Sequence, residues 1–298
     1  MPFATPSLRV RASAKIADPH AEEVEALLCL DPFGFEAGDP NLYRYVGNGP
    51  TNSLDPLGLY DDDVHFYMTY YIGLALGLGE CQTCLNRGET KNVSASFVIA
   101  WAAAYTDYNP KTRPDIILGG EDVRRRFHFR TSGDKVEAGS AEAAGIAKMG
   151  VEKCDPLLTG IGLHALQDSF SHEGFGPAAG HLRAGHNPDD PSRDVKKAMR
   201  MAKATYDALA EYLKKCCKKD PKVKWEDIAN KIEQQFALGS EEQKLDYAKQ
   251  VAARVERWKA LISDDWKVKA AFVYIKKDDP WATDFEKIAG TVTAPKQR

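Results

Sequence analysis

The residues of this chain with the clearest capacity for chemistry are its histidines. There are seven in 298 residues, and six lie in the central part of the chain: His65, His128, His164, His172, His181 and His186. His164, Asp168 and His172 follow one another at intervals of four residues. On a helix this spacing stacks the side chains on one face, with neighbouring Cβ atoms about 5–6 Å apart. Such a row suits ligands that clamp two or more metal ions about 3.5–4 Å apart, with Asp168 bridging through both oxygens.

One histidine–aspartate pair on a helix is more often an ordinary hydrogen bond than a metal site. Here the row has a third member, and His186 and Asp190 repeat the spacing further on. Other elements offer four more candidate ligands: Asp63, His65, Asp107 and His128. Imidazole and carboxylate ligands without nearby thiolates are typical of zinc, or a related divalent metal, in a catalytic site.

The elements that must position these residues are predicted to be helices. Asp155 and Pro156 supply an N-cap and a first-turn proline for a helix that runs through His172. Asp107 continues the apolar stripe of an earlier helix, so its carboxylate is expected to face inward and to need a partner. No alternation of strands and helices is visible, so we predict a mainly helical bundle. The expected helices span 63–78, 91–107, 155–172, 192–215, 225–238, 240–262 and 281–289.

Composition narrows the class of protein. The chain has 40 basic and 43 acidic side chains, a net charge of −3, which argues against an obligate polyanion binder. Its 43% hydrophobic content is typical of a soluble globular protein. The longest apolar run, 67–79, is too short to cross a bilayer, and the first residues lack the apolar core of a signal peptide.

The six cysteines are irregularly spaced, so we expect them to be mostly reduced. For Cys81 and Cys84 we expect two free thiols or a local disulfide rather than a zinc knuckle.

The chain changes character near residue 60. Residues 30–59 read LDPFGFEAGDPNLYRYVGNGPTNSLDPLGL, an irregular, β-prone segment rich in turn residues. This segment resembles the end of the core of Rhs-repeat polymorphic toxins, which precedes a variable toxin domain. The resemblance implies a truncated core remnant over residues 1–59 and a toxin domain over 60–298. It also implies autoproteolysis after Leu59 by Asp31 and Asp55, although the long repeat shell of that family is missing.

The order of histidines and aspartates resembles the zinc-dependent phospholipase C superfamily, which includes single-strand-specific zinc nucleases. The resemblance implies an all-helical fold around two or three zinc ions, and the metal ligands would be His65, Asp107, His128, His164, Asp168, His172, His186 and Asp190. His181 competes with His186, and Asp63, Asp61 or Asp62 would replace the family's N-terminal ligand. His172 follows Asp168 by four residues where the family usually has six.

The same resemblance implies hydrolysis of a phosphodiester. Asp107 and Asp168 would be the catalytic carboxylates. Arg126 and Arg130, with their neighbours Arg124 and Arg125, would receive a phosphate or head group; the alternative is a solvated basic turn.

Three functions remain open from the sequence. The first is a phospholipase toxin that attacks membrane phospholipids, the second a nuclease toxin on the same fold, and the third a non-catalytic bundle stabilised by structural zinc. Removing the first 59 residues, with 4 basic and 8 acidic side chains, leaves 36 basic and 35 acidic. A nuclease is more often strongly basic, so lipid is favoured. The toxin resemblance further implies a cognate immunity protein, and delivery from the producer's cytoplasm into target cells by secretion-system proteins.

Overall fold

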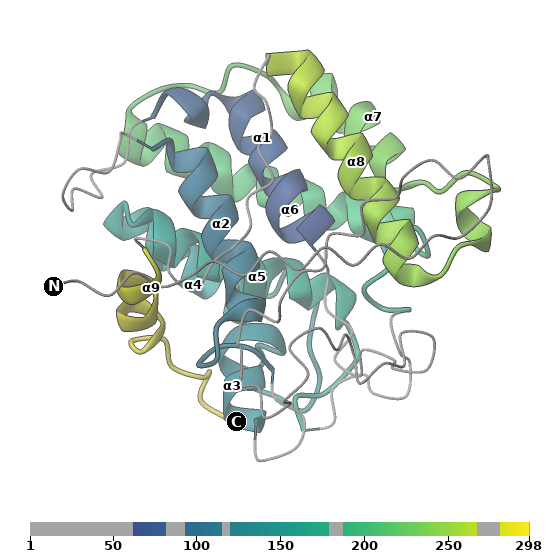
Figure 1. Cartoon of the computed structure of the whole chain (residues 1–298). Coiled ribbons are helices and arrows are strands. Elements are labelled where there is room, and N and C mark those ends of the chain that lie inside the picture. Colours follow the sequence, from purple (N-terminus) through teal and green to yellow (C-terminus); the bar gives the residue numbers. More distant parts are fainter. Residues whose placement is uncertain (1–61, 82–92, 115–119, 179–186, 267–280, 298) are drawn as a thin grey trace, which may run out of the picture. The chain divides into compact units, whose positions relative to one another are not determined.

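The computed structural model describes residues 62–81, 93–114, 120–178, 187–266 and 281–297 (Figure 1). The chain divides into two units, Met1–Leu54 and Asp55–Arg298, and all of the described residues belong to the second. The expected cleavage residues Asp31, Asp55 and Leu59 lie outside the described residues, as does the boundary at residue 60. His181 and His186 lie outside them as well.

The described part of the chain is helical, which confirms the predicted fold class. None of its helices combines the length and apolar character needed to span a bilayer. The β-structure of the described residues is limited to isolated bridges, one of which pairs Val136 with Glu173. The elements are η3 Asp63–Met68, α1 Thr69–Leu76, η4 Leu78–Glu80, α2 Ala95–Tyr108, α3 Glu121–Val123, η5 Arg124–His128, α4 Ala141–Lys153, α5 Pro156–Ser171, α6 Val195–Tyr212, η6 Leu213–Cys217, α7 Trp225–Phe236, η7 Glu242–Lys244, α8 Tyr247–Trp266 and α9 Ala282–Ala289.

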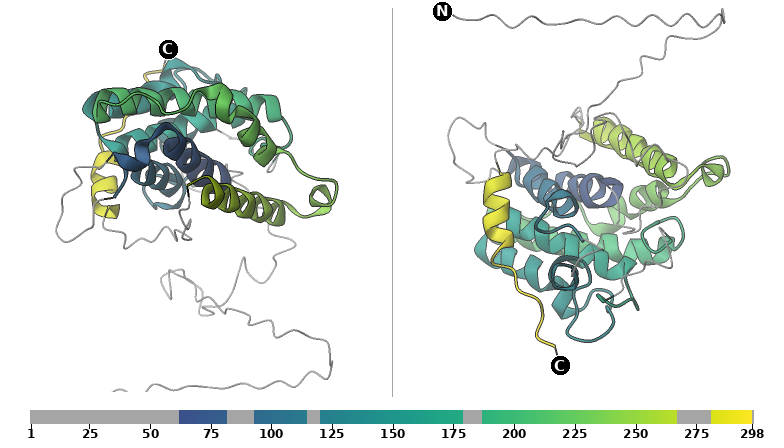
Figure 2. Two further views of the ribbon diagram at one scale, coloured as in Figure 1. Left: turned by 90° about the horizontal axis from the view of Figure 1, so that it is seen from above. Right: turned by 60° about the horizontal axis from the view of Figure 1, so that its bottom comes forward.

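Helix α5 is the centre of the bundle, and all of its residues are buried. It begins as predicted, because the Asp155 side chain accepts a hydrogen bond from the Leu158 amide at 3.0 Å and Pro156 occupies the first turn. Helices α2, α4, α6 and α9 pack on it. Helix α8 instead packs against η3, and Figure 2 shows α8 and α9 on opposite sides of the bundle. A helix covered on every side presents the residues along its length to several neighbours at once.

Two glycines allow α5 to approach its neighbours closely. A Cβ atom built on Gly160 would lie 2.4 Å from the Ile99 carbonyl oxygen of α2. One built on Gly162 would lie 2.0 Å from the Ala147 amide nitrogen of α4. No residue with a Cβ atom fits at such distances. The two glycines therefore let the backbones of α5, α2 and α4 come together just before His164.

Two of the candidate histidines lie on π-helical turns rather than on regular α-helix. His65 belongs to η3, and His128 ends η5. A π-helical turn carries one more residue per hydrogen-bonded ring than an α-helix, and such turns often occur at functional sites.

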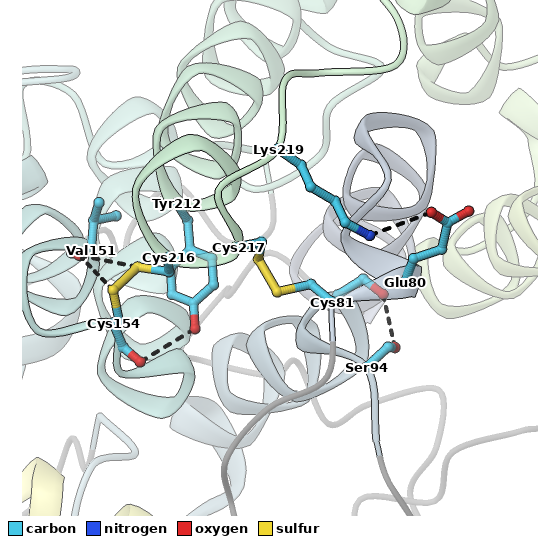
Figure 3. The surroundings of a disulfide bond; sticks show 10 residues. Glu80, Cys81, Ser94, Val151, Cys154, Tyr212, Cys216, Cys217 and Lys219 are labelled. Atoms are coloured by element: carbon cyan, nitrogen blue, oxygen red, sulfur yellow. Dashed lines mark hydrogen bonds and ion pairs between the residues drawn. A yellow bond between two sulfur atoms is a disulfide. The ribbon is translucent and has the colours of Figure 1, made fainter.

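The prediction that the cysteines are mostly reduced is wrong for the described residues. Cys81 forms a disulfide with Cys217, and Cys154 forms one with Cys216 (Figure 3). The two adjacent cysteines at the end of η6 therefore hold the end of η4 on one side and the junction of α4 and α5 on the other. The paired cysteines are 136 and 62 residues apart along the chain, which is why spacing did not reveal them.

Candidate metal centre

His164 enters the site from the middle of α5 and is fully buried. Its Nδ1 donates a hydrogen bond to the Ala103 carbonyl oxygen of α2 at 2.9 Å. Since a carbonyl oxygen only accepts, this contact fixes the proton on Nδ1 and leaves the lone pair on Nε2. Burial lowers the pKa of His164 to about 3, so the imidazole is neutral near pH 7.

His128 reaches the same point from the other direction. Its Nε2 donates to the Thr112 carbonyl oxygen at 2.8 Å, so in a neutral ring the lone pair is on Nδ1. That atom lies 2.9 Å from His164 Nε2. Two nitrogen lone pairs at this distance repel one another unless a cation, either a proton or a metal ion, lies between them.

His65 completes the set of imidazoles. Its Nδ1 is 2.8 Å from Gln167 Oε1, and its Nε2 lies 3.4 Å from Asp168 Oδ1. The ring stacks on that of His164, with 4.1 Å between centroids. Each of the three histidines thus uses one nitrogen for an oxygen outside the cluster and turns the other towards it, which is the usual arrangement around a metal ion.

Two carboxylates lie among these nitrogens. Asp168 Oδ2 is 3.0 Å from His128 Nδ1 and 3.2 Å from His164 Nε2, while Oδ1 faces His65. Asp107, in the last turn of α2, places Oδ1 3.4 Å from His164 Nε2 and Oδ2 3.7 Å from His65 Nε2. Both carboxylates therefore have one oxygen on the His65 side of the cluster and the other on the side of His128 and His164.

Burial acts to raise the pKa of Asp168, but the imidazoles of His164, His172 and His128 around it hold that pKa well below its ordinary value. The carboxylate is therefore ionised within a fully buried site. Such a buried charge requires cationic compensation.

The five residues form two overlapping groups that could each hold a metal ion. One consists of His65, His164 and Asp168, and the other of Asp107, His128 and His164, with the ligand atoms of each group within 4.8 Å of one another. Four of the five side chains are fully buried, whereas that of Asp107 is 10% exposed. The cluster thus meets solvent at Asp107.

His172 lies next to the cluster but outside both groups. Its Nδ1 donates to the His128 carbonyl oxygen at 3.2 Å, and its ring stacks on Phe129 with 3.9 Å between centroids. Its Nε2 faces Asp189 Oδ1 at 3.3 Å. The structure therefore brings Asp189 against His172, whereas Asp190, predicted as a metal ligand together with His186, lies elsewhere.

Asp190 and Asp63 bind an arginine instead of joining the cluster. Arg254 of α8 is fully buried, with Nε 2.6 Å from Asp63 Oδ2 and Nη1 3.3 Å from Asp190 Oδ1. Burial raises the pKa of Asp63 above its ordinary value, although Arg254 opposes that rise. The triad ties α8 to the start of η3, two residues before His65.

The arginines predicted to receive a phosphate make contacts within the protein. Arg130 is buried and donates to the carbonyl oxygens of Arg126, Glu142 and Thr293. Arg126 pairs with Asp122, with 2.7 Å between Nη2 and Oδ2. These contacts fasten η5, which carries His128, to α3, α4 and the C-terminal segment.

Three groups that orient the cluster were not predicted from the sequence. The Ala103 and Thr112 oxygens are backbone atoms, so no residue type marks them. Gln167 stands beside Asp168, but a lone glutamine in a buried helix carries no signal until its neighbours are known.

Comparison of the chain with models of protein families, with curated proteins and with solved structures gave no match. The Rhs and phospholipase C resemblances therefore remain predictions.

Proposed function

We propose that the described domain is a metal-dependent phosphodiester hydrolase whose centre comprises His65, Asp107, His128, His164 and Asp168. The observation that carries this proposal is the 2.9 Å approach of His128 Nδ1 to His164 Nε2, with the opposite ring nitrogens bonded to carbonyl oxygens. A metal ion satisfies both lone pairs and the two carboxylates together, whereas one shared proton satisfies a single pair.

The division of carboxylate oxygens favours two ions. His65 Nε2, Asp168 Oδ1 and Asp107 Oδ2 would hold one, and His128 Nδ1 and His164 Nε2 would hold the other with the remaining oxygens. Imidazole and carboxylate donors without thiolate suit zinc first among divalent metals. When bound, clustered divalent ions neutralise charge on phosphate oxygens and lower the pKa of a coordinated water.

The residues of the cluster have separate roles in the proposed reaction. Asp107 stands where the cluster meets solvent, so a phosphodiester approaching the centre meets this carboxylate first. Asp168 holds both halves of the cluster from the rigid central helix. The buried histidines are kept in one orientation by carbonyl and amide oxygens, which limits their reorganisation during reaction.

Phospholipid is the substrate class we favour, and nucleic acid is the alternative. The nearly balanced charge of residues 60–298 lacks the excess of lysine and arginine typical of proteins that follow a nucleic-acid backbone. The arginines on either side of His128 do not change this, because Arg130 and Arg126 are bonded within the protein.

We further propose that the domain is a toxin that acts outside the cytoplasm in which it is made. The two disulfides support this, since disulfides persist mainly in oxidising compartments. The Rhs-like segment adds the expectation of a secretion machine that delivers the chain and of a cognate immunity protein that blocks the site.

The test is to incubate zinc-loaded protein separately with phospholipid vesicles and with single-stranded RNA and DNA. His164→Ala and Asp168→Ala should abolish cleavage, while Asp207→Asn, a control at an exposed aspartate of α6, should not. Release of phosphorylated head groups supports the lipid hydrolase. Cleavage of nucleic acid with intact lipid would move the assignment to the nuclease. A zinc-loaded protein that cleaves neither would support a structural role for the metal.

A further inference from the structure

We infer that Gln167 is a positioning residue that fixes which nitrogen of His65 faces the metal centre. The inference rests on the proposed function of that centre. Gln167 lies on α5 between His164 and Asp168, and its side chain is fully buried. It contacts His65 on η3, Thr69 on α1 and Thr205 on α6, so it joins three elements at one point.

Two threonine hydroxyls define the orientation of the Gln167 amide. Thr205 Oγ1 donates its proton to the Met201 carbonyl oxygen at 3.1 Å, and Thr69 Oγ1 donates to the Val64 carbonyl oxygen at 3.4 Å. A hydroxyl has one proton to give, so each threonine accepts its remaining hydrogen bond. The group that donates to both must be the amide nitrogen of Gln167, at 2.8 Å from Thr69 Oγ1 and 3.2 Å from Thr205 Oγ1.

With its nitrogen fixed in this way, Gln167 presents its oxygen to His65. Oε1 lies 2.8 Å from His65 Nδ1 and can only accept, so the imidazole proton is on Nδ1. In a neutral ring the lone pair is then on Nε2, which faces Asp168 Oδ1 at 3.4 Å and Asp107 Oδ2 at 3.7 Å.

This tautomer opposes the local electrostatics of the metal-free cluster. Two carboxylates beside Nε2 favour a proton on that nitrogen, which would donate to Asp168 and leave no lone pair for a metal ion. Gln167 counters that preference with a direct hydrogen bond on the other side of the ring. Oxygen partners of ligating histidines act in this way, and their loss typically lowers metal affinity about 10–100-fold.

The test compares Gln167→Met, which keeps the size and removes the acceptor, with Gln167→Glu, which keeps an acceptor for His65 Nδ1. Zinc affinity is measured by competition with a chromophoric chelator, and Gln235→Met on α7 is the control for the same exchange at a distant position. We expect Gln167→Met to weaken zinc binding about 10–100-fold, and Gln167→Glu and Gln235→Met to stay near the wild type.

A second measurement reads the tautomer without any metal. In ¹⁵N-labelled, zinc-free protein, the His65 ring signals are assigned by their loss in His65→Gln. Nε2 should have the shift of an unprotonated nitrogen in the wild type and of a protonated one in Gln167→Met. Wild-type zinc affinity together with an unchanged His65 tautomer in Gln167→Met would overturn the inference. If the wild type binds no zinc, the proposed centre fails, and the tautomer measurement still decides the role of Gln167.

Should Gln167→Met fail to fold, Thr205→Val provides the test, because it removes one of the two hydroxyls that orient the amide. It should populate the Nε2-protonated tautomer of His65 in part and weaken zinc binding by a smaller factor. Two results together would contradict the assignment. They are an unchanged His65 tautomer in folded Thr205→Val, and loss of zinc binding in Gln167→Glu although its His65 tautomer is unchanged.

Discussion

His128 Nδ1 and His164 Nε2 lie 2.9 Å apart although neither nitrogen carries the proton of its neutral ring. Those protons point away from the cluster, to the carbonyl oxygens of Thr112 and Ala103. The fold thus holds two lone pairs against each other and places an ionised carboxylate beside them. An arrangement of this kind costs free energy when no cation is present and binds a cation strongly.

Removal of metal should therefore destabilise the domain. At a free zinc concentration about 100 times the dissociation constant, binding to the folded state contributes about 2.7 kcal/mol. For a domain of this size that corresponds to a rise in Tm of about 5–10 °C. The measurement is thermal unfolding in EDTA and after zinc is restored. An identical Tm in both conditions, with no zinc in the purified protein, would contradict the metal centre.

The number of bound ions should depend on the cluster and not on His172. Wild-type protein should contain two ions per chain, whereas His128→Gln and Asp168→Asn each remove ligands from the site and should lower that number. His172→Gln should retain two, because the His172 ring nitrogens lie closest to Asp189 and the His128 carbonyl oxygen, and Nδ1 is 3.9 Å from Asp168 Oδ2. Elemental analysis after dialysis gives the count. Loss of an ion in His172→Gln would place His172 among the ligands.

The sequence was sufficient for the fold class and for most of the cluster. Periodicity predicted α5 with its cap at Asp155, and the inward position of Asp107 on α2. Helix α4, however, was not predicted; it contains Gly145 and Gly150, and glycine is unfavourable inside a helix. The turns η3 and η5 were also beyond prediction as π-helical, because that geometry depends on tertiary packing rather than on local propensity.

Among the site residues, sequence spacing misled where two aspartates are adjacent. Asp189 and Asp190 are both buried, and spacing alone selected Asp190 because it repeats the His-x3-Asp pattern. In the structure Arg254, 64 residues further along the chain, binds Asp190, and Asp189 turns to His172. A distant arginine that binds one of two neighbouring carboxylates cannot be recognised from the sequence around them. The same holds for Cys216 and Cys217, whose partners are set by the packing of helix ends.

Acid should destabilise the metal-free domain between about pH 6.5 and pH 3. Burial lowers the folded-state pKa of His164 to about 3. In the unfolded chain the same imidazole has its ordinary pKa of 6.5 and is therefore protonated below that pH. The unfolded state thus binds more protons throughout that range, so stability falls as the pH falls, by up to about 1.4 kcal/mol per pH unit for one proton. Urea unfolding in EDTA at several pH values measures the slope. His164→Gln should reduce it, and parallel curves for the two proteins would contradict the assignment to His164.

Reduction of the disulfides should lower stability. In the chain-entropy description, links across 62 and 136 residues each contribute about 4–5 kcal/mol, and removal of a native disulfide typically costs about 2–5 kcal/mol. Cys154→Ser with Cys216→Ser, or treatment with a phosphine reductant, should therefore lower the urea midpoint. Because Cys216 and Cys217 are adjacent, mass spectrometry of linked peptides must fragment between them. A Cys81–Cys216 link in place of Cys81–Cys217 would contradict the pairing.

The close approach of α5 to α2 should make Gly160 intolerant of any side chain. In Gly160→Ala the new methyl group would lie 2.4 Å from the Ile99 carbonyl oxygen and 2.6 Å from Ala102 Cβ, so the helices must separate. Overpacking of this kind costs about 1–3 kcal/mol, and it would also move His164 from Ala103, one turn further along. Gly145→Ala on α4 is the matched control, because nothing lies within 4 Å of the methyl group it would add and alanine favours a helix by about 1 kcal/mol over glycine. Urea unfolding should therefore show opposite shifts for the two variants, and zinc affinity should fall in Gly160→Ala alone. Unchanged zinc affinity in Gly160→Ala would show that the α2–α5 contact does not position the metal centre.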